Sequence, residues 1–294
     1  MAQSVPTWQN ARLTGSASQN NRYSFDAVVD AVGNTYEVGD FRGTAVVGGT
    51  TLITPSGTDS DGYLVKYTPT GTVAWIKQLS STGSESVKSI ALDAAGDVYI
   101  AGDFGPSFSL GNGVGLSGGS GFISKAFVAR YSAQGAALWA HQTSATGYGA
   151  VGGGDLGVDA VGNVYCTYFA NIITVGSTTL TTLNNSKAIF LGRLSGSTGA
   201  LQSLVQAFSY ASPTPTAVYY HPTLAVAPTG EVYISTSFSH PAILGATTLT
   251  CPNANTDVLV AKYGTQGNFE WVEHLSSAGI ESVGNTVVDG SGSL

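Results

Sequence analysis

An internal repeat constrains the fold of this chain more than any other sequence feature. A short block, Asp-Ala-x-Gly followed by Asn or Asp, one variable residue and Tyr, begins at Asp30 and returns at Asp93 and Asp159. A fourth copy has Ala227 in place of the Asp, and a fifth begins at Asp289. The glycines of successive copies are 63, 66, 68 and 62 residues apart. Such a period is typical of proteins in which each repeat forms one unit that packs against its neighbours.

Two further blocks keep the same period. One is an apolar or aromatic run with a Lys or Arg before its last residue, at 63–67, 127–131, 190–194 and 259–263. The other runs from a Gly to a Trp, at 71–75, 135–139 and 267–271. Trp8 belongs to this last block too, whereas the third repeat has Ser203 where Trp is expected. All the blocks are short β-branched and aromatic runs bounded by Gly, Pro, Asn or Asp, which predicts β-strands.

Each period therefore contains four predicted strands, and we find no stretch of ten or more residues with a sustained helical period and caps. Four antiparallel strands at a fixed period are typical of the blades of a β-propeller. The stretch between the second and third strands is variable and rich in Gly, Thr and Ser. A Thr-Thr-Leu step recurs in it, at 50–52, 178–180 and 247–249, and indicates a short extra β-turn or hairpin.

We thus predict an all-β chain that forms one β-propeller domain over residues 1–294, with four complete blades and a partial fifth. The predicted blades cover about 22–80, 86–143, 150–208 and 218–275, and strands at 5–13 and 281–294 belong to the incomplete blade. This strand count indicates a truncated or incompletely closed ring. Because unpaired strand edges are templates for pairing, we expect either self-association through the terminal strands or docking of these strands to each other.

Residues that recur once per blade are assigned to the fold. We expect the repeated Asp to form an Asx turn that stabilises a hairpin, with a ring of carboxylates around an axial cation as the alternative. We expect the Tyr and Trp residues to pack between blades, and the basic residues Lys66, Arg130, Arg193 and Lys262 to project toward solvent or an acidic neighbour. The repeat positions are Asp30, Asp93, Asp159, Gly33, Gly96, Gly162, Gly230, Tyr36, Tyr99, Tyr165, Tyr233, Trp75, Trp139 and Trp271.

The Asp-Ala-x-Gly-Asn-x-Tyr, Val-x-Lys/Arg-Tyr and Trp-x-x-x-Leu motifs together resemble the SBBP-type β-propeller repeat family of bacteria. The resemblance covers roughly residues 5 to 294. It implies a propeller fold and an exported parent protein, often with a C-terminal sorting module. It implies no shared catalytic residue and no particular ligand.

Several motifs of known catalytic sites occur by chance in so glycine-rich a chain. Gly-x-Gly-x-x-Gly begins at residues 113, 147 and 152, but no predicted helix follows whose N-terminus could bind a phosphate. Ser117 lies in a Gly-x-Ser-x-Gly sequence that also lacks the strand-to-helix turn of a nucleophile elbow. The residues 59–62 resemble part of a calcium loop, and Gly57 and Thr68 stand where further acids are needed. We expect a turn there.

The four histidines show no ligand spacing, and we predict no metal and no cofactor. His141 and His274 each follow a Trp, and we expect both to occupy half-exposed strand positions. Cys166 follows a repeat Tyr and is expected to be a small buried hydrophobe, and Cys251 lies in a Thr-rich loop. Two cysteines are too few for a disulfide framework, and whether they interact stays open.

Charge excludes some classes of partner. The formal net charge is −7 and only 10% of residues are charged, so nonspecific nucleic-acid binding and attraction to an anionic membrane are not expected. No apolar run is long enough to cross a membrane, and no signal peptide precedes the first repeat.

Three functions remain open at this point. The first is a noncatalytic, secreted or cell-surface propeller that serves as a scaffold or binds a carbohydrate or protein at one face. The second is a propeller-type polysaccharide lyase or glycosidase, which needs a convergent acid pair or a Tyr/His/Arg cluster. The third is a structural segment of a large surface adhesin.

Overall fold

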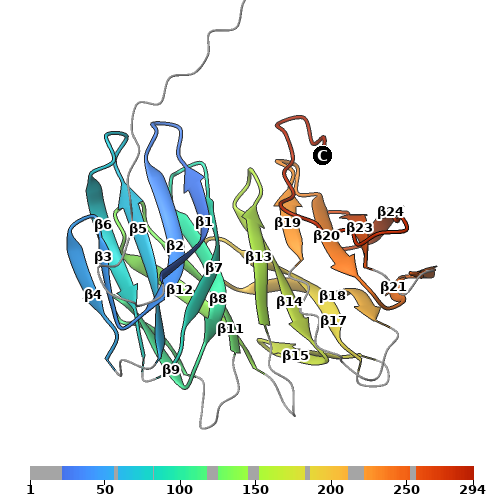
Figure 1. The fold of residues 1–294 in the computed structure, drawn as a ribbon, viewed down its shortest axis with the longest axis horizontal. Coiled ribbons are helices and arrows are strands. Elements are labelled where there is room, and N and C mark those ends of the chain that lie inside the picture. The colour runs from blue at the N-terminus through green and yellow to red at the C-terminus, as the bar shows by residue number, and fades with distance from the viewer. Residues whose placement is uncertain are drawn as a thin grey trace, which may run out of the picture.

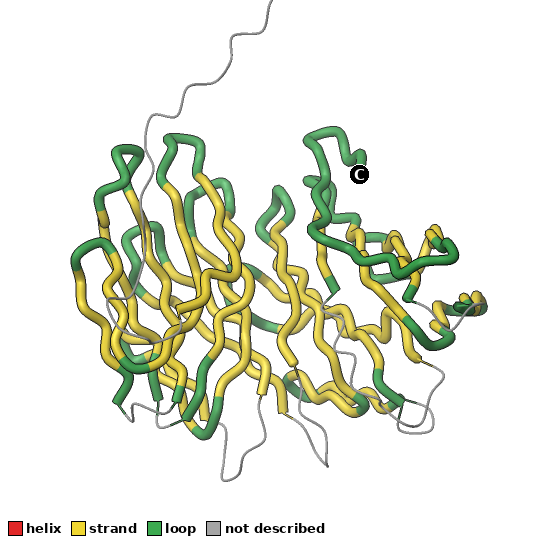
Figure 2. Tube along the Cα trace, in the orientation of Figure 1, coloured by secondary structure: helices red, strands yellow, loops and turns green. Residues whose placement is uncertain are grey.

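The computed structural model describes residues 22–55, 59–81, 83–117, 125–144, 152–182, 186–210, 222–251 and 256–294. Within these ranges the regular structure is entirely β-strand, as the tube in Figure 2 shows. No described element is a helix that could span a membrane. The all-β prediction is therefore confirmed.

Four sheets repeat one pattern, in which the four main strands are hydrogen-bonded in chain order and run antiparallel. They follow one another from blue to orange in Figure 1. Blade one is β1 (Arg22–Val29), β2 (Thr35–Arg42), β5 (Ser60–Tyr67) and β6 (Val73–Leu79). Blade two is β7 (Ser86–Leu92), β8 (Val98–Phe104), β11 (Lys125–Tyr131) and β12 (Ala137–Ser144). Blade three is β13 (Gly152–Val158), β14 (Asn163–Ala170), β17 (Ala188–Ser195) and β18 (Leu201–Tyr210). Blade four is β19 (Thr223–Val226), β20 (Val232–Phe238), β23 (Asp257–Tyr263) and β24 (Phe269–Leu275). This is the four-stranded antiparallel blade of a propeller.

Each blade also carries a small hairpin between its second and third main strands. The hairpins are β3–β4 (Thr44–Val47, Thr50–Ile53), β9–β10 (Ser107–Gly111, Val114–Ser117), β15–β16 (Ile172–Val175, Thr178–Thr181) and β21–β22 (Ala242–Leu244, Thr247–Leu249). Strand β15 pairs with β12 and β21 pairs with β18. The hairpin of one blade therefore extends the outer edge of the preceding blade, a role that the sequence did not reveal.

The core lies between neighbouring blades. One cluster joins blades one and two and includes Tyr36, Phe127 and Tyr131, each fully buried. A second joins blades two and three around Tyr99 and Phe190, and a third joins blades three and four. The apolar faces of a single sheet are exposed to water until another sheet covers them. Each blade therefore depends on its neighbour to bury its apolar side chains.

The C-terminal residues 281–294 correct one prediction, because no strand forms there. The segment lies against blade four (Figure 1), where Val288 packs on Ala225, Ala227 and Tyr233. A strand needs a hydrogen-bonded neighbour, and no described segment pairs with this one. The other predicted terminal strand, residues 5–13 with Trp8, lies outside the described residues.

Candidate functional site

The first strand of each blade, its inner strand, carries an irregularity in blades one to three. The register shifts between Ser24 and Asp26 in β1, between Val87 and Ser89 in β7, and between Gly153 and Leu156 in β13. A bulge leaves a residue unpaired and turns its side chain out of the ladder. The side chains of the bulged residues Phe25 and Lys88 can therefore point away from the sheet, and in β13 the corresponding residue is Gly154.

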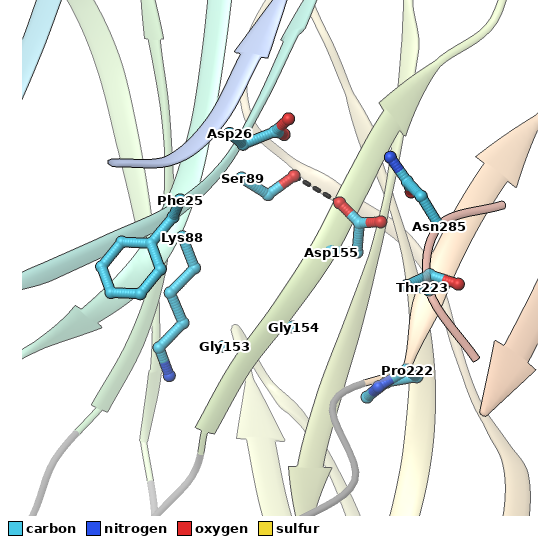
Figure 3. A pocket seen from close by; sticks show the side chains of 11 residues that line it. Phe25, Asp26, Lys88, Ser89, Gly153, Gly154, Asp155, Pro222, Thr223 and Asn285 are labelled. Atoms are coloured by element: carbon cyan, nitrogen blue, oxygen red, sulfur yellow. Dashed lines mark hydrogen bonds between the residues drawn. The ribbon is translucent and has the colours of Figure 1, made fainter. Parts of the chain in front are cut away.

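One pocket of about 420 Å³ is lined by Gly153 and by two consecutive residues from each of the five repeat copies, the first three of which carry a bulge there. The first residue of each pair changes in character from copy to copy, whereas the second is always small and polar. The pairs are Phe25–Asp26, Lys88–Ser89, Gly154–Asp155, Pro222–Thr223 and Gly284–Asn285. In Figure 3, Phe25 and Lys88 lie on one side of this axial pocket, and Pro222, Thr223 and Asn285 lie on the other.

In blades one to three, the polar residue of the pair binds the inner strand of the next blade. Asp26 Oδ2 accepts the Ile90 N–H at 3.0 Å, and Asp155 Oδ2 accepts the Leu224 N–H at 2.9 Å. Ser89 accepts the N–H of Leu156 at 3.2 Å and donates to Asp155. Each of these contacts provides a hydrogen-bond partner for a backbone N–H of an inner strand.

A polar residue four positions before each hairpin turn was the sequence signal for this ring. The predicted repeat positions were the turn residues and not these polar residues.

Burial changes the electrostatics of the pocket. It raises the pKa values of Asp155 and Asp26. The negative charge of Asp155 adds to the rise at Asp26. Lys88 forms an ion pair with Asp103, and the Phe25 side chain is 48% exposed. The pocket thus offers an aromatic surface, an ammonium group, an amide and two carboxyl groups with reduced acidity. Among the described residues, no three His, Cys, Asp or Glu side chains are grouped so as to hold a metal ion.

The repeated Asp residues are placed in the hairpin turns, away from this pocket. Asp30 Oδ1 accepts the N–H groups of Val32 and Asn34 at 3.1 and 2.8 Å, and its Oδ2 accepts the Tyr36 hydroxyl at 3.3 Å. Asp93 and Asp159 make the corresponding bonds. The turn glycines adopt φ values of +80° to +94°, which favour glycine: Gly33, Gly96, Gly162 and Gly230. The carboxylates are thus engaged in Asx turns within their own blades, and this geometry favours the turn role over an axial cation ring.

The Tyr and Trp residues lie at the contacts between blades. The rings of Tyr36 and Trp75 are 6.0 Å apart, and the Trp75 indole N–H donates to the Ala133 carbonyl of blade two at 3.2 Å. Trp139 packs on Tyr99 and donates to Gly196 of blade three at 2.7 Å. These contacts join blades one to two and two to three.

The contact expected for Trp271 is only partly formed. Its ring packs on Tyr233 at 6.0 Å, but the side chain is 38% exposed, because no following blade among the described residues covers it. Tyr165 has no such partner, since Ser203 occupies the Trp position.

The repeated basic residues also bridge blades. Lys66 donates to the same Ala133 carbonyl at 3.4 Å, Arg130 to Gly196 at 2.8 Å, and Arg193 to Thr265 at 3.3 Å. Arg130 forms an ion pair with Asp97 at 2.7 Å, and Lys262 forms one with Glu270 at 3.2 Å. The Trp and the basic residue of one blade thus hold a turn carbonyl of the next; we call this the blade clamp.

The remaining sequence candidates are dispersed. Ser117 ends strand β10, where its backbone N–H and carbonyl bond the Gln142 side chain. Both cysteines are free thiols, and burial raises the pKa of Cys166 to about 12 and that of Cys251 to about 11. His274 lies 2.7 Å from Asp257, and the half-buried His141 has a pKa lowered by burial. His221 is outside the described residues.

Known proteins are similar to parts of this chain. No family model matches it. An uncharacterized WD repeat-containing protein of Acanthamoeba polyphaga mimivirus is 32% identical over 89 residues, 29% of this chain and 6% of that protein. The repeated four-stranded sheets decide the classification. This chain is a β-propeller repeat module.

Two solved structures of larger proteins align with most of this module. The quinohemoprotein alcohol dehydrogenase of Comamonas testosteroni aligns with 89% of it at 10% identity and a TM-score of 0.35. The quinohemoprotein alcohol dehydrogenase ADHIIG of Pseudomonas putida HK5 aligns with 86% at 12% identity and a TM-score of 0.34. The alignments cover 61% and 59% of those chains, so the module spans less than two thirds of either.

Proposed function

We propose that this propeller is a noncatalytic binding module whose ligand enters the axial pocket. The observation that carries the proposal is that the two residues of each pair differ in role: one is constant in character and the other varies. The second residue is always small and polar, because in blades one to three it binds the next inner strand. The first residue does not make this bond to the next inner strand. It varies from Phe25 through Lys88 to Gly154, so its side chain can serve to recognise a ligand.

The ligand class that this lining fits best is a carbohydrate. The half-exposed Phe25 ring offers an apolar face against which the C–H groups of a sugar can stack. Asn285 offers both a donor and an acceptor for hydroxyl groups, and Lys88 offers a donor. A concave site with one aromatic surface and a few polar groups is the usual form of a small-molecule site. A protein segment is the alternative ligand.

We further propose that the parent protein is an exported bacterial protein of the SBBP type, in which the module is secreted or displayed at the cell surface. The repeat motifs described above support this assignment. Fractionation of the native host, with antibodies against the module, tests it. Recovery only from the cytosol would contradict it.

A carbohydrate-active enzyme is the second candidate, because two carboxyl groups with raised pKa, Asp26 and Asp155, line the same pocket. A glycosidase needs a carboxyl group that stays protonated near neutral pH as its general acid. Turnover of a polysaccharide panel by the wild-type chain, lost in Asp155→Asn, would favour this candidate over simple binding.

The test of binding is a glycan array followed by calorimetry on the best ligand. We expect Phe25→Ala and Lys88→Ala each to weaken affinity about tenfold or more, which is a loss of at least about 1.4 kcal/mol. Trp271→Ala is the control, because it removes an exposed aromatic side chain that does not line the pocket. Binding that Phe25→Ala and Lys88→Ala leave unchanged would place the ligand elsewhere.

We also propose that the chain self-associates, with a second copy of the chain as the partner. Strands β12 and β18 are paired along their outer edges by hairpins of the following blade, whereas β24 has no such partner among the described residues. The exposed Trp271 and Leu275 lie on this strand. Light scattering should report a dimer or larger species that Leu275→Lys reduces. A monomer at high concentration would contradict it.

A further inference from the structure

A nine-residue linker occurs twice in the chain and lies outside the repeat positions discussed so far. It reads Leu-Ser-Ser-x-Gly-x-Glu-Ser-Val and occupies residues 79–87 and 275–283. In each case it follows the last strand of a blade, β6 or β24. The Ser hydroxyl donates to the Glu carboxylate in both copies, from Ser81 to Glu85 and from Ser277 to Glu281.

The first copy buries two carboxyl groups at the junction of blades one and two. Glu85 is 1% exposed and Asp61, at the start of β5, is 0% exposed. The Glu85 N–H donates to the Ser60 carbonyl at 2.8 Å, which brings the linker against the residue before Asp61. Gln78 donates to Asp61 Oδ2 at 2.5 Å. Neither carboxyl group makes an ion pair within the described residues.

One oxygen of each group is left without a hydrogen bond. These atoms, Asp61 Oδ1 and Glu85 Oε2, are both buried. A buried carboxylate with neither a cation nor enough donors is strongly disfavoured, since its charge has lost the solvation of water. A proton removes one charge and converts an acceptor oxygen into a donor.

We propose that the junction of blades one and two contains a proton-binding site, in which Glu85 is a neutral carboxylic acid in mildly acidic solution. The proton is part of the folded junction. Its loss in alkaline solution creates a second buried negative charge beside Asp61 and weakens the attachment of linker 79–87 to blade one.

The electrostatics of the surrounding groups support this site. Burial raises the pKa of Glu85 to about 7, opposed by the Ser81 hydroxyl and assisted by the charge of Asp61. Burial likewise raises the pKa of Asp61 to about 6, opposed by Gln78 and assisted by Asp59. The backbone N–H groups of Ser81 and of Gly105, after β8, also act on Glu85 and oppose the rise of its pKa.

The second copy provides an internal control. His274 stands where blade one has Gln78, and its Nε2 lies 2.7 Å from Asp257 Oδ2. One backbone bond is the same in both copies, because Glu281 N–H donates to the Thr256 carbonyl at 2.8 Å as Glu85 N–H does to the Ser60 carbonyl. Glu281 as a whole is only partly buried, although its Oε2 is buried without a hydrogen bond like that of Glu85. The second site differs from the first in the basic partner of its Asp and in the partial exposure of its Glu side chain.

The sign of the pH effect follows from proton linkage. Because the pKa of Glu85 is raised in the folded state, the folded chain binds more protons than the unfolded chain between about pH 4.5 and about pH 7. The contribution of Glu85 to the free energy of unfolding therefore decreases as pH rises through this window. Above the window this contribution no longer changes with pH.

The experiment compares thermal unfolding of the whole chain at pH 5 and pH 8 for wild type, Glu85→Gln and Glu281→Gln. We expect the melting temperature of wild type to fall by about 5 °C over this range, most of the fall to vanish in Glu85→Gln, and Glu281→Gln to behave like wild type. The protection factors of the amides of residues 83–87, which correct for the intrinsic pH dependence of exchange, should fall between pH 5 and pH 8 in wild type but not in Glu85→Gln. Asp61→Asn, which removes the same repulsion, serves if Glu85→Gln does not fold.

Three outcomes would overturn the proposal. The first is the same pH dependence in wild type and Glu85→Gln. The second is a Glu85 carboxyl carbon that titrates below pH 5 by NMR. The third is a melting temperature that millimolar calcium raises at pH 8 in wild type but not in Glu85→Gln, because a cation would then occupy the site instead of a proton.

Discussion

The junction after blade one and the open side of blade four have nearly the same sequence and different surroundings. At the first, Trp75 and Lys66 both donate to the Ala133 carbonyl of blade two. At the second, Trp271 is exposed and Lys262 pairs with Glu231 and Glu270 on its own blade. The comparison teaches that a repeat residue acquires its role from the following blade. The same Trp is an inter-blade anchor in one copy and a surface side chain in the other.

The outer strand edges differ in the same way. Strands β12 and β18 are paired by β15 and β21, and Ser80, the residue after β6, makes a single bridge to Ser109 in the hairpin of blade two. Strand β24 has no such neighbour in the described part of the chain. Blade four is therefore the blade whose stability depends most on its own residues.

The largest expected effect tests the blade clamp directly. Trp139→Ala removes the hydrogen bond to Gly196 and the packing on Tyr99, and should lower the free energy of unfolding by roughly 3 kcal/mol. Trp271→Ala, on the open side, should lower it by less than about 1 kcal/mol. Urea denaturation of both variants measures the difference. Equal losses would mean that the following blade adds nothing to the Trp contact.

A second prediction concerns the turn that the clamp holds. Gly199 has a φ of +70°, and a Cβ there would lie 2.7 Å from the Trp139 ring. Gly199→Ala should destabilise the chain by roughly 2 kcal/mol, because backbone strain and a clash add. Gly176→Ala is the matched control, with a φ of +60° and open space around it, and should lose only about 1 kcal/mol. The melting temperatures of the two variants should differ accordingly.

Removal of an Asx turn should have a smaller effect. Asp159→Ala deletes the bonds to the Val161 and Asn163 N–H groups, for an expected loss of about 1 kcal/mol. Blade four already has Ala227 at this position and keeps the backbone bonds of the turn. Asp159→Ala should therefore fold with an unchanged circular dichroism spectrum. A change in that spectrum would mean that the carboxylate decides the fold of the hairpin.

The smallest effect is on thiol chemistry. Burial raises the pKa of Cys166, between blades two and three, to about 12, so at pH 8 nearly all of it is the unreactive thiol. Cys251, in blade four, is half-buried with a pKa raised to about 11. We expect Cys251 to react slowly with a disulfide reagent, faster as pH rises, and Cys166 to react only after unfolding. Rapid labelling of Cys166 would show that blades two and three separate readily.

The repeat spacing was sufficient to predict the strand content, the four-stranded blades and the Asx turns, because these depend on contacts within about 60 residues. It did not predict the pairing of each hairpin with the preceding blade. Those bonds join segments such as 172–175 and 143–144, and the strands carry no sequence mark of their partner. The axial pocket was missed for a similar reason, since its lining comes from five separate copies of the repeat.

The sequence by itself determined the unit: the order of strands in a blade, the turn glycines and the positions of Tyr, Lys or Arg and Trp. Local propensity and side-chain bonds within one hairpin suffice for these. Only the tertiary structure decided which Trp is covered, which carboxyl groups are buried together and which residues face the axis. Each of these depends on how one blade packs on the next. The identity of a residue does not say whether its neighbour is water, as for Trp271, or another sheet, as for Trp75.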